Sequence, residues 1–233
     1  WLHRQFEVPE EGVLRICFSG VFYRSKAWLD GTFLGEHEGG YSPFSFVVKN
    51  ARRGSHALTV RVDNRLSAET LPKQGVDWFP YGGIYRPVYL ELVSTAFIDR
   101  FHVIVTGLDS SSAALLVRVF VRNLGDTGEE KALKFSVDGR TLYSGTHRVA
   151  PGESTVEFRA AVENPRLWSP DDPYLYSARV VLGNAEDDQF SRFGIRSFTA
   201  SGNQILLNGR RFKLRGQTAT RTIRTGVPRF RRT

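Results

Sequence analysis

Three stretches of the chain combine aromatic residues and prolines with carboxylates, and the first two also contain glycines. They are residues 28–46 (WLDGTFLGEHEGGYSPFSF), 77–91 (DWFPYGGIYRPVYLE) and 163–180 (ENPRLWSPDDPYLYSARV). Loops of this composition can offer flat faces to sugar rings and carboxylates to sugar hydroxyls. The alternative is that the aromatic residues fill the core and the glycines and prolines shape turns. Composition alone favours this alternative.

Adjacent carboxylates, which could serve acid–base chemistry, occur at Glu10–Glu11, Glu129–Glu130 and Asp171–Asp172. The two glutamate pairs lie at predicted turns, which indicates solvated surface. Asp171–Asp172 stands in a loop bounded by prolines, where an aspartate typically caps a turn. We therefore expect no catalytic carboxylate in this chain.

Ligands for a metal or a cofactor are sparse. His37 has no second histidine at metal-ligand spacing, so we expect it to be a structural hydrogen-bonding residue. Cys17, the single cysteine, lies in the apolar run LRICFSG and is predicted to be a buried, inert thiol. One cysteine allows neither an intrachain disulfide nor a cysteine metal cluster. We predict no metal and no cofactor.

The elements that must position these residues are strands. In ALTVRVDNR, Leu58, Val60 and Val62 alternate with polar residues, and LLVRVFVRN shows the same period of two. The dipeptides Asp30-Gly31, Asp138-Gly139 and Asn208-Gly209 suit type I′ hairpin turns. No segment keeps the period of a long amphipathic helix. The fold class is predicted to be all-β, with β-sandwiches at residues 1–94 and 96–199, a hairpin at 200–216 and a tail at 217–233.

The net charge of +8 raises the question of nucleic-acid binding. Five arginines without any acid lie in residues 217–233, which leaves +3 for the other 216 residues. The body of the chain is therefore only mildly basic, and we expect no nucleic-acid partner. No apolar run approaches the ~20 residues that cross a bilayer, so no membrane partner is expected. Residues 1–10 lack the apolar region of a signal peptide, which favours the cytoplasm.

Several motifs, in one order, resemble the front half of glycoside hydrolase family 2, the β-galactosidase and β-glucuronidase family. They are VFYRSKAWLDGTFLGEHEGGYSPFSF, WFPYGGIYRPVYLE, NPRLWSPDDPYLY, and FGIRSF followed by LLNGRRFKLRG. The resemblance covers nearly all of residues 1–216. It implies a sugar-binding jelly-roll domain, incomplete at its N-terminus, then an immunoglobulin-like domain and the lead-in to a catalytic TIM barrel that is missing here.

The resemblance implies a reaction as well. The family hydrolyses β-glycosidic bonds with retention, using two glutamates about 5 Å apart. Both glutamates belong to the barrel, so this chain is expected to be an N-terminal fragment that is inactive by itself. The expected partner is a β-glycoside or oligosaccharide, and the parent enzyme could be a homo-oligomer. The alternative is a stand-alone carbohydrate-binding protein made of two β-sandwiches.

One substrate-binding residue follows from the resemblance. In the family, an aspartate shortly before the G-I-x-R element accepts hydrogen bonds from substrate hydroxyls, and Asp77 holds that position here. An ionised carboxylate accepts from two hydroxyls at once, which suits vicinal diols. The alternative role for Asp77 is to cap its loop. Arg86 of the same motif is expected to be a structural ion-pair partner or a backbone clamp.

Residues 217–233 depart from the family's pattern. One permitted set of codons from Gly216 onward, read one base along, gives A-N-R-H-E-D-H-P-D-W-G-S, which resembles the family's continuation into the barrel. We therefore expect the tail to be an out-of-frame translation and disordered, since it lacks apolar periodicity. The alternative is a genuine basic extension.

Overall fold

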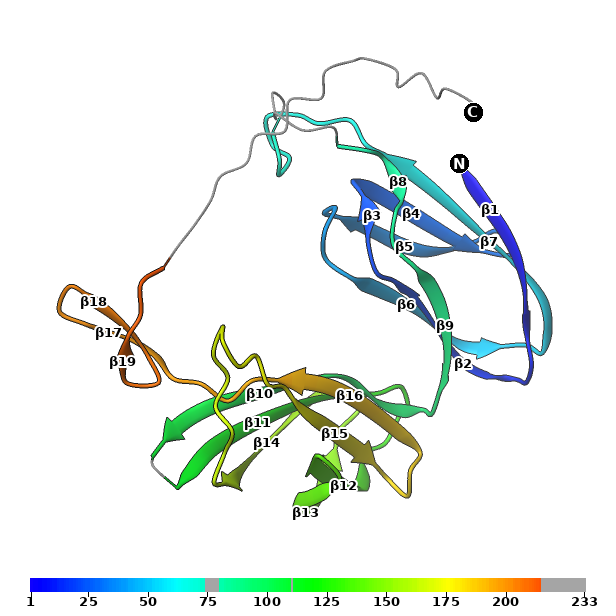
Figure 1. Ribbon diagram of the computed structural model, residues 1–233. Helices are drawn as coiled ribbons and strands as arrows, with labels where there is room; N and C mark the ends of the chain where they lie inside the picture. The colour runs from blue at the N-terminus through cyan, green and yellow to red at the C-terminus, as the bar shows by residue number, and fades with distance from the viewer. Residues whose placement is uncertain (74–79, 110, 215–233) are drawn as a thin grey trace, which may run out of the picture.

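The computed structural model describes residues 1–73, 80–109 and 111–214, and every regular element in these ranges is a β-strand (Figure 1). The predicted all-β class is confirmed. The described residues include no helix that is long and apolar enough to cross a membrane. The predicted tail, residues 217–233, lies outside the described residues.

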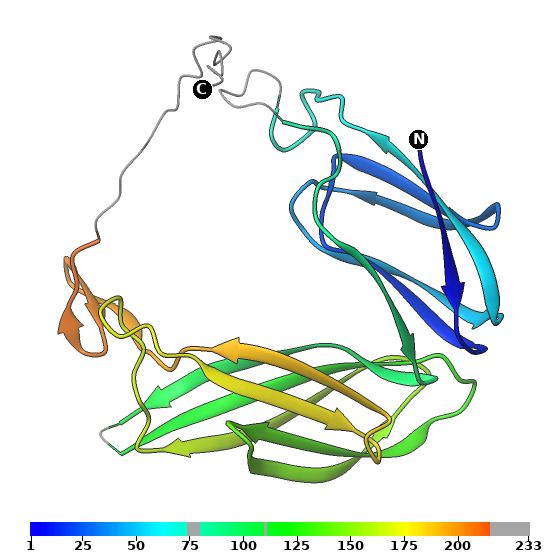
Figure 2. The same ribbon diagram turned by 45° about the vertical axis from the view of Figure 1, so that its right-hand side comes forward.

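The first sandwich consists of two main sheets and a short ribbon. Its sheets have the strand orders β1-β7-β4-β5 and β6-β2-β9, and β3 pairs with β8 (Figure 2). The strands are β1 (Leu2–Val8), β2 (Gly12–Phe18), β3 (Val21–Phe22), β4 (Arg24–Leu29), β5 (Thr32–Glu38), β6 (Phe44–Ala51), β7 (Gly54–Asp63), β8 (Gly83–Ile84) and β9 (Val88–Val93). Apolar side chains from both sheets form one core, which includes Leu14, Ile16, Phe18, Ala27, Leu58 and Val60. This is the jelly-roll-like part of the chain.

The second sandwich has seven strands, the number typical of an immunoglobulin-like domain. Its sheets have the orders β10-β11-β14 and β13-β12-β15-β16. The strands are β10 (Ala96–Leu108), β11 (Ser112–Asn123), β12 (Glu129–Val137), β13 (Arg140–Val149), β14 (Gly152–Glu163), β15 (Tyr176–Leu182) and β16 (Asp187–Phe193). Its separate core includes Val117, Val119, Val121, Phe135, Val180 and Ile195.

Both cores form because apolar residues recur at every second position of the strands. In β11, Val117, Val119 and Val121 are fully buried, while the residues between them are only half-buried. In β7, Leu58 and Val60 are buried in the same way. Successive side chains of a strand point to opposite faces, so alternating apolar residues place one face on the core.

All three predicted hairpin turns are confirmed. Asp30, Asp138 and Asn208 have φ angles of 49°, 47° and 52°, and the glycines that follow them have φ angles of 82°, 81° and 73°. Positive φ at both central residues defines the type I′ turn, whose twist matches that of the flanking strands. Glycine reaches this conformation without strain because it has no Cβ.

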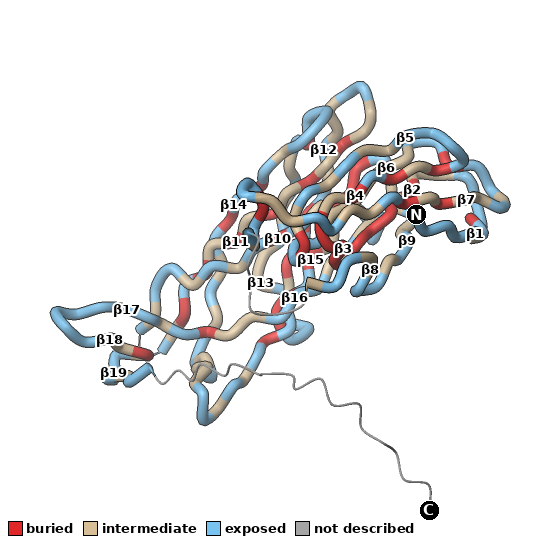
Figure 3. Tube along the Cα trace, turned by 90° about the horizontal axis from the view of Figure 1, so that it is seen from above, coloured by how far each residue is buried: buried red, intermediate tan, exposed pale blue. Residues whose placement is uncertain are grey.

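A third, smaller sheet follows the two sandwiches and is mostly exposed (Figure 3). It contains β17 (Phe198–Ser201), β18 (Gln204–Leu207) and β19 (Arg210–Arg211). Asn208 anchors it: its Nδ2 donates to the carbonyl of Trp168 at 3.1 Å, and its Oδ1 accepts from the backbone N–H of Ser197 at 3.0 Å. The predicted hairpin region therefore forms a three-stranded sheet within residues 198–211.

Candidate functional site

Asp77, the predicted substrate-binding residue, lies outside the described residues. The described chain on its N-terminal side is held by side-chain hydrogen bonds. The backbone N–H of Leu71 donates to the hydroxyl of Tyr23 at 3.0 Å. Thr70 is fully buried, and its hydroxyl donates to the carbonyls of Ser67 and Pro72 at 3.0 and 2.8 Å. Residues 67–72 are therefore fixed against the first sandwich.

The chain on the C-terminal side of Asp77 is held by strand pairing and close packing. β8 pairs with β3, which places Gly83 opposite Phe22. The hydroxyl of Tyr85 donates to the carbonyl of Gly40. Gly82 packs so closely on Asn64 that a Cβ at this glycine would lie 2.6 Å from the asparagine side chain. Both sides of the segment that contains Asp77 thus have defined positions.

Arg86 acts as the backbone clamp that the sequence predicted. Its Nη1 donates to the carbonyl of Tyr41 at 3.2 Å, and its guanidinium lies over the ring of Tyr85 at 5.2 Å. Gly20 allows this packing, because a Cβ there would lie 2.9 Å from Cδ of Arg86. Arg86 therefore joins the chain after Asp77 to the loop after β5.

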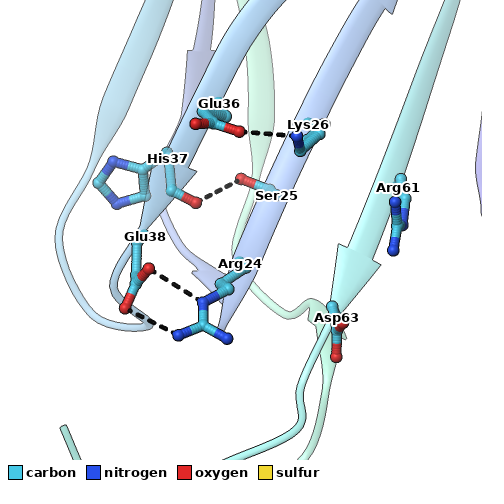
Figure 4. A pocket seen from close by; sticks show the side chains of 8 residues that line it. All are labelled: Arg24, Ser25, Lys26, Glu36, His37, Glu38, Arg61 and Asp63. Atoms are coloured by element: carbon cyan, nitrogen blue, oxygen red, sulfur yellow. Dashed lines mark hydrogen bonds and ion pairs between the residues drawn. The ribbon is translucent and has the colours of Figure 1, made fainter. Parts of the chain in front are cut away.

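A polar depression covers the solvent face of β4, β5 and the end of β7 (Figure 4). Ion pairs cross it from β4 to β5: Lys26 with Glu36 at 2.9 Å, and Arg24 with Glu38 at 2.9 Å. Arg61 and Asp63 of β7 complete it. Hydrogen bonds from Arg65 hold the pKa of Asp63 below its usual range. Because Asp63 ends β7, the depression borders the segment that leads toward Asp77.

The adjacent carboxylates do not form a catalytic pair. Glu10–Glu11 lies in an exposed bend, as predicted. The prediction that Glu129–Glu130 lies at a turn was wrong, because these residues begin β12. Glu129 pairs with Lys131 at 2.9 Å.

The prediction that Asp172 caps a turn was also wrong. Its carboxylate forms a two-pronged ion pair with Arg166, at 2.9 and 2.7 Å, and does not cap a turn. The hydroxyl of Ser169 supplies the cap by accepting from the N–H of Asp172 at 3.0 Å. The turn was predicted correctly, but the capping side chain was not.

His37 and Cys17 both have structural environments. The ring of His37 stacks on Phe44 with centroids 4.0 Å apart, and its Nε2 is buried without a hydrogen-bond partner. Burial lowers the pKa of His37, opposed by a hydrogen bond with the backbone of Gly39. His37 is thus mainly a packing residue. Cys17 is buried as predicted, and burial raises the pKa of its thiol to about 11, which disfavours the reactive thiolate.

Most aromatic side chains of the third stretch belong to the core, as the alternative interpretation predicted. Tyr176 is buried, and Tyr174 packs against the same core. The ring of Trp168 lies under Arg196 at 4.6 Å and closely contacts Gly194. This stretch links β14 to β15 and contacts the small sheet through the carbonyl of Trp168.

Comparison with known proteins indicates the family to which this fold is related. Residues 96–196, the second sandwich, match the model of glycosyl hydrolases family 2. The chain therefore contains a glycosyl hydrolase family 2 domain. The predicted resemblance is confirmed, and it extends well beyond the matched domain.

Relatives in glycosyl hydrolase family 2 match about nine-tenths of the chain. A β-galactosidase of Thermoanaerobacterium thermosulfurigenes is 30% identical over 90% of this chain and 31% of its own length. A β-glucuronidase of Sus scrofa is 28% identical over 93% of this chain and 38% of its own length. A β-galacturonidase of Eisenbergiella tayi, solved with galacturonate bound, is 30% identical with a TM-score of 0.81 over 92% of this chain and 38% of that chain. The chain thus spans about a third of these relatives.

Some contacts were not predictable from local sequence. Arg15 lies in an apolar strand, and its partner Asp99 is 84 residues away. An arginine inside the run LRICF was the available signal, because a charge in a buried strand needs a partner. The aromatic contact of Trp1 with Trp28, at 5.4 Å between centroids, depends on the pairing of β1 and β4 with β7 and has no local signal.

Proposed function

We propose that these residues form the non-catalytic, substrate-side part of a retaining β-glycosidase of the β-galactosidase or β-glucuronidase type, which hydrolyses O-glycosidic bonds of carbohydrates. The observation that carries the proposal is the match to β-galactosidases and β-glucuronidases over nine-tenths of the chain. The proposal includes the division into a sugar-binding domain at 1–94 and an immunoglobulin-like domain at 96–199.

The chain alone is proposed to be inactive. Retaining hydrolysis needs two carboxyl groups about 5 Å apart on either side of the scissile bond. In the described residues, two pairs of carboxylates each share one cation. Glu129 and Glu186 both contact Lys131, at 2.9 and 2.7 Å, and Glu91 and Asp99 both contact Arg15, at 3.5 and 3.2 Å. The cation between each pair of carboxylates fills the space that a substrate would need between two catalytic carboxyl groups.

Asp77 is proposed to contact the substrate. The described residues on both sides of it are anchored through Tyr23, Tyr85 and Arg86, which supports the proposal. In the longer enzyme, Asp77→Asn should lower kcat/KM for a nitrophenyl β-glycoside about 10- to 100-fold, the value of one charge-assisted hydrogen bond. Asp171→Asn, an exposed aspartate of the second sandwich, is the matched control. Equal rates for the two variants would refute the role of Asp77.

The function is tested by assaying nitrophenyl β-galactoside and nitrophenyl β-glucuronide with this chain and with the longer product expected when the same gene is read one base along after Gly216. The proposal predicts hydrolysis by the longer product only. Glycan binding without hydrolysis by either polypeptide would instead indicate the stand-alone binding protein.

A further inference from the structure

The outer face of the sheet β1-β7-β4-β5 carries a row of three aromatic rings, of which the central one is half-buried and the outer two are exposed. In β4, Ser25, Ala27 and Leu29 are buried, whereas Lys26 and Trp28 point to the opposite face. The ring centroid of Trp28 lies 5.4 Å from that of Trp1 and 5.5 Å from that of Phe33. Trp1 is 77% exposed and Phe33 is 52% exposed. We call these three rings the aromatic platform.

The polar depression continues the aromatic platform along the same face. Lys26 is two residues before Trp28 on β4, and the sheet places it between Glu36 of β5 and Arg61 of β7. Figure 4 shows Lys26 directed toward Glu36, with Arg24 and Glu38 paired in the next row. The rings and the ion pairs therefore form one continuous surface.

None of the described elements covers this surface. The second sandwich contacts the other sheet of the first sandwich: Arg15 of β2 binds Asp99, and Lys49 of β6 donates to the carbonyl of Leu124 at 3.1 Å. Trp1 and Phe33 contribute little to the core, because both are more than half exposed. Exposed contiguous aromatic residues on a sheet face typically mark a binding surface.

The charge of the surface indicates the chemistry of its ligand. Four cations, Arg24, Lys26, Arg61 and Arg65, lie beside three carboxylates, Glu36, Glu38 and Asp63, so every carboxylate is close to a cation and the formal charge is only +1. A nearly balanced surface gives an anionic ligand little net attraction. It does provide donors and acceptors side by side, and sugar hydroxyls both donate and accept. The flat rings of the platform suit the C–H face of a pyranose ring.

We propose that the aromatic platform and the polar depression together bind a neutral glycan chain. The sugar rings lie on Trp28 and Phe33, and hydroxyls reach the Lys26–Glu36 pair. This site is separate from the contact proposed for Asp77, and it does not depend on the proposed hydrolysis. It would hold a polymeric substrate on the sandwich, independently of bond cleavage.

The test measures binding of the 233-residue chain to cellohexaose, xylohexaose and β-1,4-galactohexaose by isothermal titration calorimetry. We expect at least one of these neutral hexasaccharides to bind. Trp28→Ala should weaken binding about tenfold, the value of one stacked aromatic ring, and Phe33→Ala should weaken it several-fold. Glu36→Gln, which keeps the shape of the side chain, should also weaken it. Thermal unfolding of each variant verifies that it is folded.

Phe198→Ala is the matched control, because Phe198 is 55% exposed but lies on β17. It should bind like the wild-type chain. Hexagalacturonate is the charged probe and should bind more weakly than the neutral hexasaccharides. Three results would each overturn the proposal: no neutral hexasaccharide binds, Trp28→Ala and Phe33→Ala bind as tightly as wild type, or hexagalacturonate binds best in a salt-sensitive manner.

Discussion

At the scale of single residues, Arg15 joins the two sandwiches. It extends from β2 toward Glu91 of β9 and Asp99 of β10, and its guanidinium lies 5.7 Å from the ring of Phe97. Its side chain is only 13% exposed, so few of its contacts are screened by water. A largely buried arginine with two carboxylate partners orients the elements that carry them. Arg15 is therefore expected to contribute to stability more than the ion pairs on the surface.

Arg15→Ala should lower the free energy of unfolding by about 1–3 kcal/mol, because it removes the cation that Glu91 contacts and leaves Asp99 with Arg100 alone. The measurement is urea denaturation followed by fluorescence. Arg118→Ala is the control, since Arg118 pairs with Glu157 on the surface and should contribute less than about 1 kcal/mol. Equal losses in the two variants would contradict the role of Arg15.

Asp30 and His56 should make stability depend on pH. Hydrogen bonds from the backbone of Ala57 and from His56 lower the pKa of Asp30. Hydrogen bonds to the carbonyl of Arg52 and to Asp30 raise the pKa of His56 above its ordinary 6.5. The contribution of Asp30 is lost as pH falls through its lowered pKa, and that of His56 is lost as pH rises through its raised pKa. Both are present in full between about pH 4 and 6.5.

Asp30→Asn should therefore flatten the decrease of unfolding free energy between pH 6 and 8.5, because His56 loses its charged partner. Asparagine also adopts positive φ readily, so the turn itself is preserved. Urea denaturation at several pH values measures the effect, with Asp171→Asn as the control. Parallel pH profiles for wild type and Asp30→Asn would show that the pair does not titrate as described.

At the scale of elements, the type I′ turns set the register of the hairpins. The turn at Asp138-Gly139 connects β12 and β13, and its backbone conformation requires positive φ at both residues. The register then decides which side chains of the two strands point to the core. A substitution that disfavours the turn should destabilise the sandwich without any lost contact.

Gly139→Ala tests this directly, because no atom lies within 4 Å of the Cβ that it would add and only φ of 81° is unfavourable. We expect a loss of about 1 kcal/mol of unfolding free energy. Gly107→Ala in β10 is the control: its Cβ would make an ordinary contact of 3.6 Å with Ala114, and its φ is not positive. A Gly139→Ala variant as stable as wild type would argue against the turn conformation.

At the scale of the whole molecule, β9 is an open edge. It pairs with β2, and within the described residues it has no second neighbour. Tyr89, Leu90 and Leu92 of this strand are 49%, 38% and 38% exposed. An exposed apolar edge strand promotes association between chains. We expect the chain to self-associate at micromolar concentrations, and Leu90→Lys to reduce this, as measured by light scattering. A monodisperse wild-type monomer would contradict the expectation.

A structural feature could be predicted from the sequence when the residues that form it lie close together in the chain. The strands and type I′ turns were predictable because alternation and Asp-Gly or Asn-Gly dipeptides act over a few residues. The partners of Arg15 and the meeting of Trp1, Trp28 and Phe33 depend on the pairing of distant strands. Asp172 shows the same effect at short range: its turn was predicted, but its ion pair with Arg166 was not.

Catalytic inactivity of the chain is tested by assaying purified chain 1–233 beside the longer product expected from the shifted reading frame after Gly216, on nitrophenyl β-glucuronide and nitrophenyl β-galactoside. We predict turnover by the longer enzyme and none by the chain, since its neighbouring carboxylates surround Arg15 and Lys131. Hydrolysis by the purified chain itself, lost on substitution of one of its own carboxylates, would contradict the proposal that these sandwiches lack the catalytic pair.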